Sequence, residues 1–362
     1  MATRIGVVVV MLGAALASAG DSVRSPPQRR PFLVPSQILK RLEASGAAVR
    51  IAGIETLQDV ARGQLADETW KELVPAIEYP RVKRKNGIIT VEAWPRPAAV
   101  DAPMEMAELA FQQRDYEEAA AWYRKTLDVA PDFYIAHAYL GDTHLFGASD
   151  PDAAIAEYDQ AIAANPDDYR IYFFRANAYL RKQDFKSMLA DLRRSLVLKP
   201  RNQILLGALS KAQGLMGRAE AEVLVPRGFV RQEGDVVTVY ADIDRPEWLA
   251  WANCKALWLT DAAHRKAVLG TTEHGWSTAE ELECLGSLMS VYQSRKVKGI
   301  GPSDDRLEML QQITVDGMAT AFVIYELGSR VDPQIVLRLG SKYRAMVTRY
   351  VGKYVLPPHE YE

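Results

Sequence analysis

Small and aromatic residues recur along residues 100–200 with a period of 34 to 35 residues, and each repeat ends at a proline: Pro131, Pro166 or Pro200. A period of this length is typical of helix–turn–helix units, which stack because none can bury its apolar face alone. Each proline follows the last turn of a second helix, where it cannot continue the hydrogen-bond ladder. The pattern therefore predicts three stacked helical pairs that present a curved surface to partners.

The three units share their small and aromatic positions. The matching residues are Ala107, Ala119, Tyr123 and Thr126, then Gly141, Ala154, Tyr158 and Ala161, then Ala176, Met188, Leu192 and Ser195. Small residues let two helices cross closely, and aromatic residues fill the volume beside each crossing. Together they closely resemble the tetratricopeptide repeat. Met188 in place of alanine and His137 in place of tryptophan depart from the family and predict looser or shifted packing.

The resemblance implies a binding groove formed by the first helix of each unit. The positions that would contact a partner are Met104, Glu108 and Phe111, then Asp142, Leu145 and Phe146, then Arg170, Phe173, Asn177, Leu180 and Arg181. Some family members clamp a peptide carboxylate there with amide and cationic side chains, which Met104, Glu108 and Asp142 cannot supply. We therefore expect an apolar floor that suits an amphipathic helix or an extended apolar segment.

A self-occluded groove is an equal alternative. Three units make a short groove, the flanking regions are long enough to fill it, and large exposed apolar patches are uncommon on monomers. Beyond Pro200, residues 202–217 have an amphipathic helical pattern, and we expect a capping helix over the last apolar face.

The fold class expected is mostly α, with flanking domains on both sides of residues 100–220. Residues 20–99 should form a small mixed region, disordered over 25–31, with short helices over 36–44 and 67–77. Asn86-Gly87 predicts a β-hairpin within residues 81–94. We expect the region as a whole to lean on the first repeat.

Residues 221–362 should form a helical domain with its own core. It begins with a strand over 234–241, and helices are expected over 246–263, 278–294, 303–314, 316–327 and 332–354, with Gly340-Ser341 as a candidate restart of the last helix. This part is similar to the C-terminal part of repeat-containing bacterial proteins of unassigned role.

The N-terminus has the pattern of an export signal. Arg4 is followed by an apolar run over residues 5–16 and by the small-residue motif Ala17-Ser18-Ala19. The run is short for a bilayer span, so we expect residues 1–19 to be removed, leaving no membrane span. The alternative is an N-terminal anchor. The protein is thus expected to be periplasmic or secreted.

Charge and cysteine content agree with this expectation. The 44 basic and 46 acidic residues nearly balance, which argues against nucleic acid as a partner. An oxidising compartment favours a disulfide between the two cysteines, Cys254 and Cys284. If they lie on antiparallel helices around residues 261–276, each sits about 10 Å from the same end. The alternative is two separately buried thiols.

One polar cluster could carry chemistry: His264, His274, Glu280, Glu281 and Cys284. Its spacing fits no compact metal-ligand pattern, and a catalytic thiol would compete with the disulfide. We therefore predict no catalytic residue, metal or cofactor, and a scaffold that binds a protein or peptide partner in the cell envelope. The alternatives are an enzyme whose repeats recruit substrate, and a structural protein whose repeats brace the C-terminal domain. Convergence of His264, His274 and Glu280 on a pocket would favour the enzyme.

Overall fold

The computed structural model describes residues 32–54, 74–215, 226–301 and 304–357, which form two compact units. We call them the repeat unit (residues 75–215 and 333–357) and the sheet unit (residues 32–54, 74, 226–301 and 304–332). The export signal expected over residues 1–19, the proline-rich stretch over 25–31 and most of the helix expected over 67–77 lie outside the described residues.

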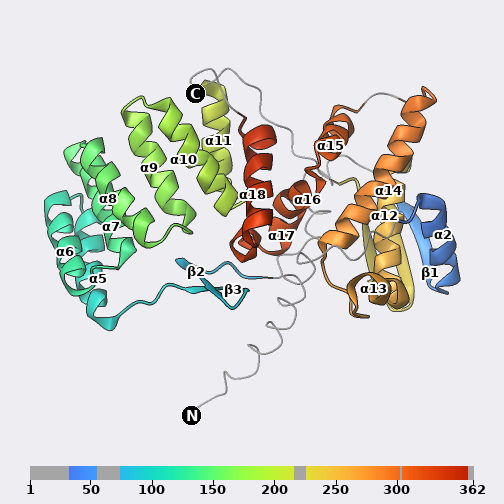
Figure 1. Cartoon of the computed structure of the whole chain (residues 1–362), viewed down its shortest axis with the longest axis horizontal. Coiled ribbons are helices and arrows are strands. Elements are labelled where there is room, and N and C mark those ends of the chain that lie inside the picture. The colour runs from blue at the N-terminus through green and yellow to red at the C-terminus, as the bar shows by residue number, and fades with distance from the viewer. Residues whose placement is uncertain (1–31, 55–73, 216–225, 302–303, 358–362) are drawn as a thin grey trace, which may run out of the picture. The chain divides into compact units, whose positions relative to one another are not determined.

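Three helical pairs form the centre of the repeat unit. The pairs are α5 (Asp101–Gln112) with α6 (Tyr116–Val129), α7 (Tyr134–Thr143) with α8 (Pro151–Ala164), and α9 (Tyr169–Arg181) with α10 (Phe185–Leu198). Each helix contacts the next along the chain, and α11 (Gln203–Leu215) follows α10. Figure 1 shows these helices side by side in chain order. The predicted array of three pairs with a capping helix is confirmed.

Local sequence explains where these helices begin and how closely they cross. The side chains of Asp115 and Asp184 accept hydrogen bonds from backbone N–H groups of the first turns that follow them. A Cβ atom at Gly141 would lie 2.6 Å from the Cε1 atom of buried Tyr158, so this crossing of α7 and α8 requires glycine.

A β-hairpin packs on the repeats. Strands β2 (Pro80–Lys85) and β3 (Ile88–Ala93) are antiparallel. Asn86 and Gly87 join them with φ angles of 51° and 75°, the left-handed values that a two-residue turn needs. Val82 and Val91 of the hairpin pack in a cluster with Tyr172 and Leu198 of the third repeat and Leu337 of the C-terminal segment. Trp94, which follows β3, packs against the core cluster formed mainly by the first two repeats.

The helix expected over residues 332–354 is not continuous, and its last part begins at Ser341, the candidate restart. The chain instead makes a 3-10 segment, η4 (Ile335–Arg338), and then α18 (Ser341–Tyr350) and η5 (Val351–Val355). Ile335, Val336 and Leu337 are all buried, and Leu339 and Gly340 have extended backbone, with ψ angles of 145° and 164°. The helix therefore begins after Gly340, and α18 contacts α10.

The sheet unit combines segments from both sides of the repeats. Its strands are β1 (Ala48–Gly53), β4 (Gly228–Glu233) and β5 (Val236–Ala241), in the order β1-β5-β4. Strand β1 is parallel to β5, whereas β4 is antiparallel to it. The expected strand over 234–241 corresponds to β5. Because the unexpected strand β1 joins this sheet, the compact units differ from the consecutive domains 20–99 and 221–362.

Helices cover this sheet and supply most of the unit's core. They are α2 (Pro35–Ala44), α12 (Pro246–Thr260), α13 (Ala262–Leu269), α14 (Thr278–Val297), α15 (Asp305–Val315), α16 (Ala319–Phe322) with π-helical η3 (Val323–Gly328), and α17 (Ser329–Val331). Helix α12 contacts β4, β5, α2 and α14, which explains why it is apolar on nearly every side. A disulfide between Cys254 and Cys284, with Cα atoms 5.2 Å apart, joins α12 to α14.

Candidate functional site

The inner face of the repeats is formed by α5, α7 and α9, and the eleven expected groove residues have different fates there. Met104 and Leu145 are fully buried in the core, while Phe146 stays exposed. Phe111 and Phe146 make an edge-to-face contact with ring centres 6.4 Å apart. Glu108 is exposed at the surface of α5. Glu108 of the first repeat and Phe146 of the second are therefore open to solvent.

A pocket of about 280 Å³ opens between α9, α10 and α11. It contains three of the expected groove residues, Phe173, Asn177 and Leu180, and α11 forms its other wall. The remaining lining residues are Ala176, Met188, Leu192, Ile204, Gly207, Ala208, Lys211 and Ala212. The predicted groove did not include α11, although the apolar residue Ile204 near the start of this helix was a usable signal.

The cationic end of the groove is fixed by its neighbours. The guanidinium of Arg181 lies 5.1 Å from the ring centre of Phe146, and its Nη1 donates to the carbonyl oxygen of Leu145 at 2.7 Å. Because both contacts hold the side chain against η2 (His144–Ala148), Arg181 lines one side of the groove.

Asp142 is held inside the repeats. The hydroxyl of Tyr158 donates to Asp142 Oδ1 at 2.6 Å. Burial raises the pKa of Asp142 to about 7, although the hydrogen bond from Tyr158 lowers it in part. A carboxyl so engaged is a structural partner of Tyr158, and a ligand contact is not its main role.

We expect Asp142→Asn to remove a pH dependence of stability. Because the folded-state pKa of Asp142 is raised, the wild type should lose stability as pH rises from about 4 through about 7. Asparagine keeps an acceptor for Tyr158 without the charge. The variant should therefore be about 1–2 kcal/mol more stable than the wild type at pH 8, allowing for partial solvent screening. Urea unfolding between pH 4 and 8 measures this difference in stability. Asp128→Asn is the control, because Asp128 is exposed. Parallel pH profiles for the wild type and Asp142→Asn would contradict a raised pKa of Asp142.

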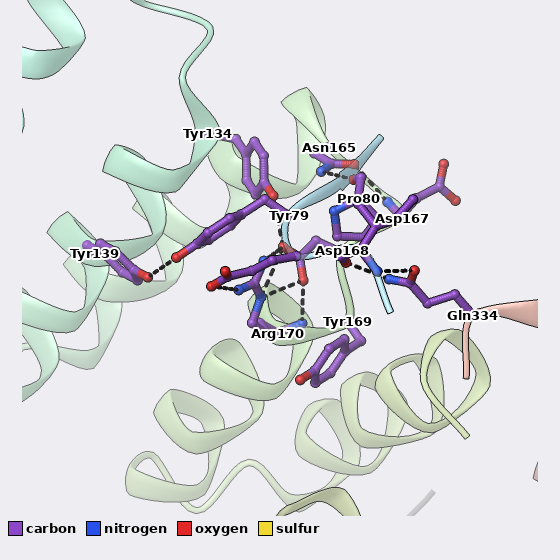
Figure 2. Close-up of polar contacts among 12 residues, drawn as sticks. Tyr79, Pro80, Tyr134, Tyr139, Asn165, Asp167, Asp168, Tyr169, Arg170 and Gln334 are labelled. Carbon is purple, nitrogen blue, oxygen red and sulfur yellow. Dashed lines mark hydrogen bonds and ion pairs between the residues drawn. The ribbon is translucent and has the colours of Figure 1, made fainter. Parts of the chain in front are cut away.

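Residues 77–80 of the same chain cover the inner face at Tyr139 and Arg170 (Figure 2). The hydroxyl of Tyr79 lies 3.0 Å from that of Tyr139 on α7. The guanidinium of Arg170 on α9 lies 4.0 Å from the ring centre of Tyr79. Burial and the hydrogen bond with Tyr79 raise the pKa of Tyr139 above its ordinary value. Arg170, an expected groove residue, is thus covered from within, as the self-occlusion alternative predicts for part of the groove.

Two buried amide side chains hold the backbone of this segment. Gln334 accepts from the N–H of Ile77 and donates to its carbonyl oxygen, both at 2.8 Å. Asn165 Nδ2 donates to the carbonyl oxygen of Pro80 at 2.9 Å. No local sequence signal connects these residues, since Gln334 lies far beyond the repeats.

The polar residues singled out near Cys284 form two separate buried networks in the sheet unit. Glu283 accepts from Trp258 Nε1 at 2.7 Å and from the N–H of Leu33 at 3.0 Å, and its Oε2 lies 2.8 Å from His264 Nε2. The partners of Glu283 come from the segment before α2, from α12 and from α13, so this network joins all three to α14.

The second network is centred on Lys255. Its Nζ contacts Glu280 and lies 2.8 Å from Glu281 Oε1, and His274 Nε2 lies 3.4 Å from Glu280 Oε2. His264 and Glu280 are thus in different networks and do not converge on one site. Sequence reasoning missed Lys255, although a single lysine in an otherwise apolar helix predicts a buried partner.

Two features of the described residues concern metal binding and membrane insertion. No group of three or more histidine, cysteine, aspartate or glutamate residues in the described ranges is placed to hold a metal ion. None of the helices within those ranges combines the length and apolar character that crossing a membrane requires.

Comparison with known proteins identifies the repeats. The sequence model of the tetratricopeptide repeat family matches residues 89–133, 104–145 and 143–202. These residues therefore contain tetratricopeptide repeats. Repeat arrays of this kind form concave binding surfaces, which supports a role in protein–protein interaction and is typical of a non-enzymatic scaffold. Comparison with curated proteins gives no match.

Several solved structures are similar to about a third of this chain. The first TPR domain of human RPAP3 is 23% identical, with 34% of this chain and 95% of that chain covered and a TM-score of 0.32. The Yersinia enterocolitica type III secretion chaperone SycD, in complex with a peptide of the translocator YopD, is 15% identical, with 34% and 92% covered and a TM-score of 0.31. The Arabidopsis OM64 TPR domain is 18% identical, with 32% and 96% covered and a TM-score of 0.31.

Proposed function

We propose that the protein is an interaction scaffold whose repeats bind an apolar or amphipathic segment of a partner protein in the pocket between α9, α10 and α11. The observation that carries this proposal is the open pocket itself, which presents Phe173, Leu180 and Ile204. Ile204 is 64% exposed although it lies in a concavity, and apolar side chains in such a place favour a protein ligand.

The size and polarity of the pocket define the expected ligand more closely. About 280 Å³ accommodates one or two bulky side chains and not a whole helix, so the partner should insert side chains from a segment lying across the pocket. Asn177 and Lys211 add an amide and an ammonium to the otherwise apolar lining. These groups would orient a segment whose apolar side chains alternate with polar ones.

A crosslinking experiment tests the pocket. We expect a photoreactive phenylalanine analogue at Ile204 to crosslink to a specific partner in the source cells, and Phe173→Asp to reduce the crosslink yield about tenfold or more, because a charge replaces an apolar anchor. Val129→Asp on α6 is the matched control, since Val129 is also exposed in the repeat unit but does not line the pocket. Equal yields from all three chains, each folded by circular dichroism, would contradict the proposal.

We also propose that this binding takes place in the cell envelope. The export pattern before Gly20 and the disulfide between Cys254 and Cys284 support that location, because disulfides persist in oxidising compartments. Mass spectrometry of the protein recovered from fractionated cells provides the test. A chain that begins at Gly20 in the envelope fraction is expected, and an uncleaved chain in the cytoplasm would refute the assignment.

A further inference from the structure

The contacts of residues 77–80 are those of a bound peptide. Gln334 and Asn165, which are 3% and 2% exposed, form hydrogen bonds with backbone groups at the two ends of the segment. Buried amides that pair with the main chain are a usual way to hold an extended peptide without regard to its side chains. Between the two clamps, Tyr79 contacts Arg170 and Tyr139 through its side chain, and the exposed carboxylate of Glu78 lies 4.0 Å from Arg170 Nη1.

The residues that receive Tyr79 are held in place independently of it. Asp168, which is 1% exposed, accepts from Arg170 Nε at 3.0 Å and from the hydroxyl of Tyr134 at 2.9 Å. Arg170 is therefore positioned by a buried carboxylate before any ring approaches its guanidinium (Figure 2). A fixed guanidinium over one ring face and a tyrosine hydroxyl at the ring edge together select a phenol.

Tyr79 is strained in this position. Its φ angle is 52°, in the left-handed region that a bulky aromatic residue rarely adopts. Such an outlier persists only when surrounding contacts impose it, and outliers of this kind are concentrated at ligand clamps and switch regions. The strain opposes the contacts that hold the segment, so it favours exchange of the segment for another ligand.

We propose that the inner face between α7 and α9 is a recognition site for a segment with a tyrosine followed by a proline, and that Glu78-Tyr79-Pro80 is its tethered, exchangeable occupant. The tether raises the local concentration of the occupant far above that of a free ligand, so the site is closed until a competing segment displaces it. Arg170 and Phe173 lie one turn apart on α9, which places this site next to the pocket between α9, α10 and α11. The inference stands whether or not that pocket binds a partner.

Peptide binding to the full chain tests this proposal. The probe is a fluorescent peptide with the sequence of residues 75–82, Pro-Ala-Ile-Glu-Tyr-Pro-Arg-Val. It should bind the Tyr79→Ala chain about tenfold or more tightly than the wild type, because the resident aromatic ring is gone. Arg170→Ala added to Tyr79→Ala, or alanine in place of tyrosine in the peptide, should weaken that binding about tenfold.

Two further variants keep the outcome decisive. Tyr79→Phe loses only the contact with the Tyr139 hydroxyl, so it should fold even if Tyr79→Ala does not, and it should bind the peptide a few-fold more tightly than the wild type. Ile204→Asp in the Tyr79→Ala chain should leave peptide binding unchanged, which separates this site from the pocket. Absence of binding to the folded Tyr79 variants, or binding that is insensitive to Arg170→Ala, would overturn the proposal.

Discussion

Replacing Lys255 by methionine is expected to lower the free energy of unfolding by about 3–5 kcal/mol, because breaking a buried ion pair leaves uncompensated charge in the core. Glu280 and Glu281 are 2% and 0% exposed, and both contact the Lys255 ammonium. Burial alone would lower the pKa of Lys255, but the two carboxylates outweigh it and raise that pKa to about 12. Methionine matches the length of lysine, so the loss should come from electrostatics and not from packing.

The pH dependence gives this prediction a second readout. Burial acts to raise the pKa of Glu280, but Lys255 and His274 outweigh it, and the net shift is downward. A lowered carboxyl pKa contributes stability that is present above the unfolded value and is lost as pH falls through the folded value. In Lys255→Met the main cause of that lowering is removed, so acidification should destabilise the variant less than the wild type.

Denaturation in urea, followed by the fluorescence of the buried tryptophans of α12, measures both effects. Lys266→Met on α13 is the control, since Lys266 is exposed and should change stability by less than about 0.5 kcal/mol. Adding Glu280→Gln and Glu281→Gln to Lys255→Met should restore part of the loss, because the stranded charges disappear. A loss below about 1 kcal/mol for Lys255→Met would contradict the description of this network.

Removal of the disulfide is the second large expected effect. Cys254 and Cys284 are 30 residues apart, and closing a loop of that length in the unfolded chain is worth about 3–4 kcal/mol. Both side chains are fully buried between α12 and α14. The double variant Cys254→Ala/Cys284→Ala should therefore unfold at a clearly lower urea concentration than the oxidised wild type.

Reductant provides the matched control for the disulfide. Dithiothreitol should bring the wild type close to the double variant and should leave the double variant unchanged. A wild type whose unfolding is insensitive to reductant would contradict a disulfide in the folded protein. Mass spectrometry under non-reducing conditions, after alkylation of free thiols, checks the oxidation state directly.

The repeats were predictable because their determinants are local. Helix starts at Asp115 and Asp184, the small residue Gly141 opposite Tyr158, and the regular prolines all act within one helical pair or between adjacent pairs. The hairpin was predictable for the same reason, since Asn86-Gly87 specifies its turn without help from the rest of the chain.

Strand β1 was not predictable from its own residues. It is short and largely exposed, so the alternation of apolar and polar residues that marks a half-buried strand is weak. Its register is set by β5, in which Val237 and Val239 are buried opposite Val49 and Ile51. A parallel partner so far along the chain leaves no trace in a local pattern.

The binding face was predictable only in part. Family positions located Phe173, Asn177 and Leu180, which line the open pocket. The same positions could not reveal that Arg170 is covered by Tyr79, because that contact depends on how the chain returns to the repeats. Lys255 was missed for a related reason: the carboxylates that make its burial tolerable come from α14.

Pairing of β1 with β5 has a consequence for how the protein is made. Ala48 pairs with Val236, so the whole repeat array must leave the ribosome before β1 finds its neighbour. Contacts of such long range slow folding and prolong the exposure of unpaired edges. A fragment ending near residue 220 would contain all three repeats and β1, but it would lack β5, with which β1 pairs.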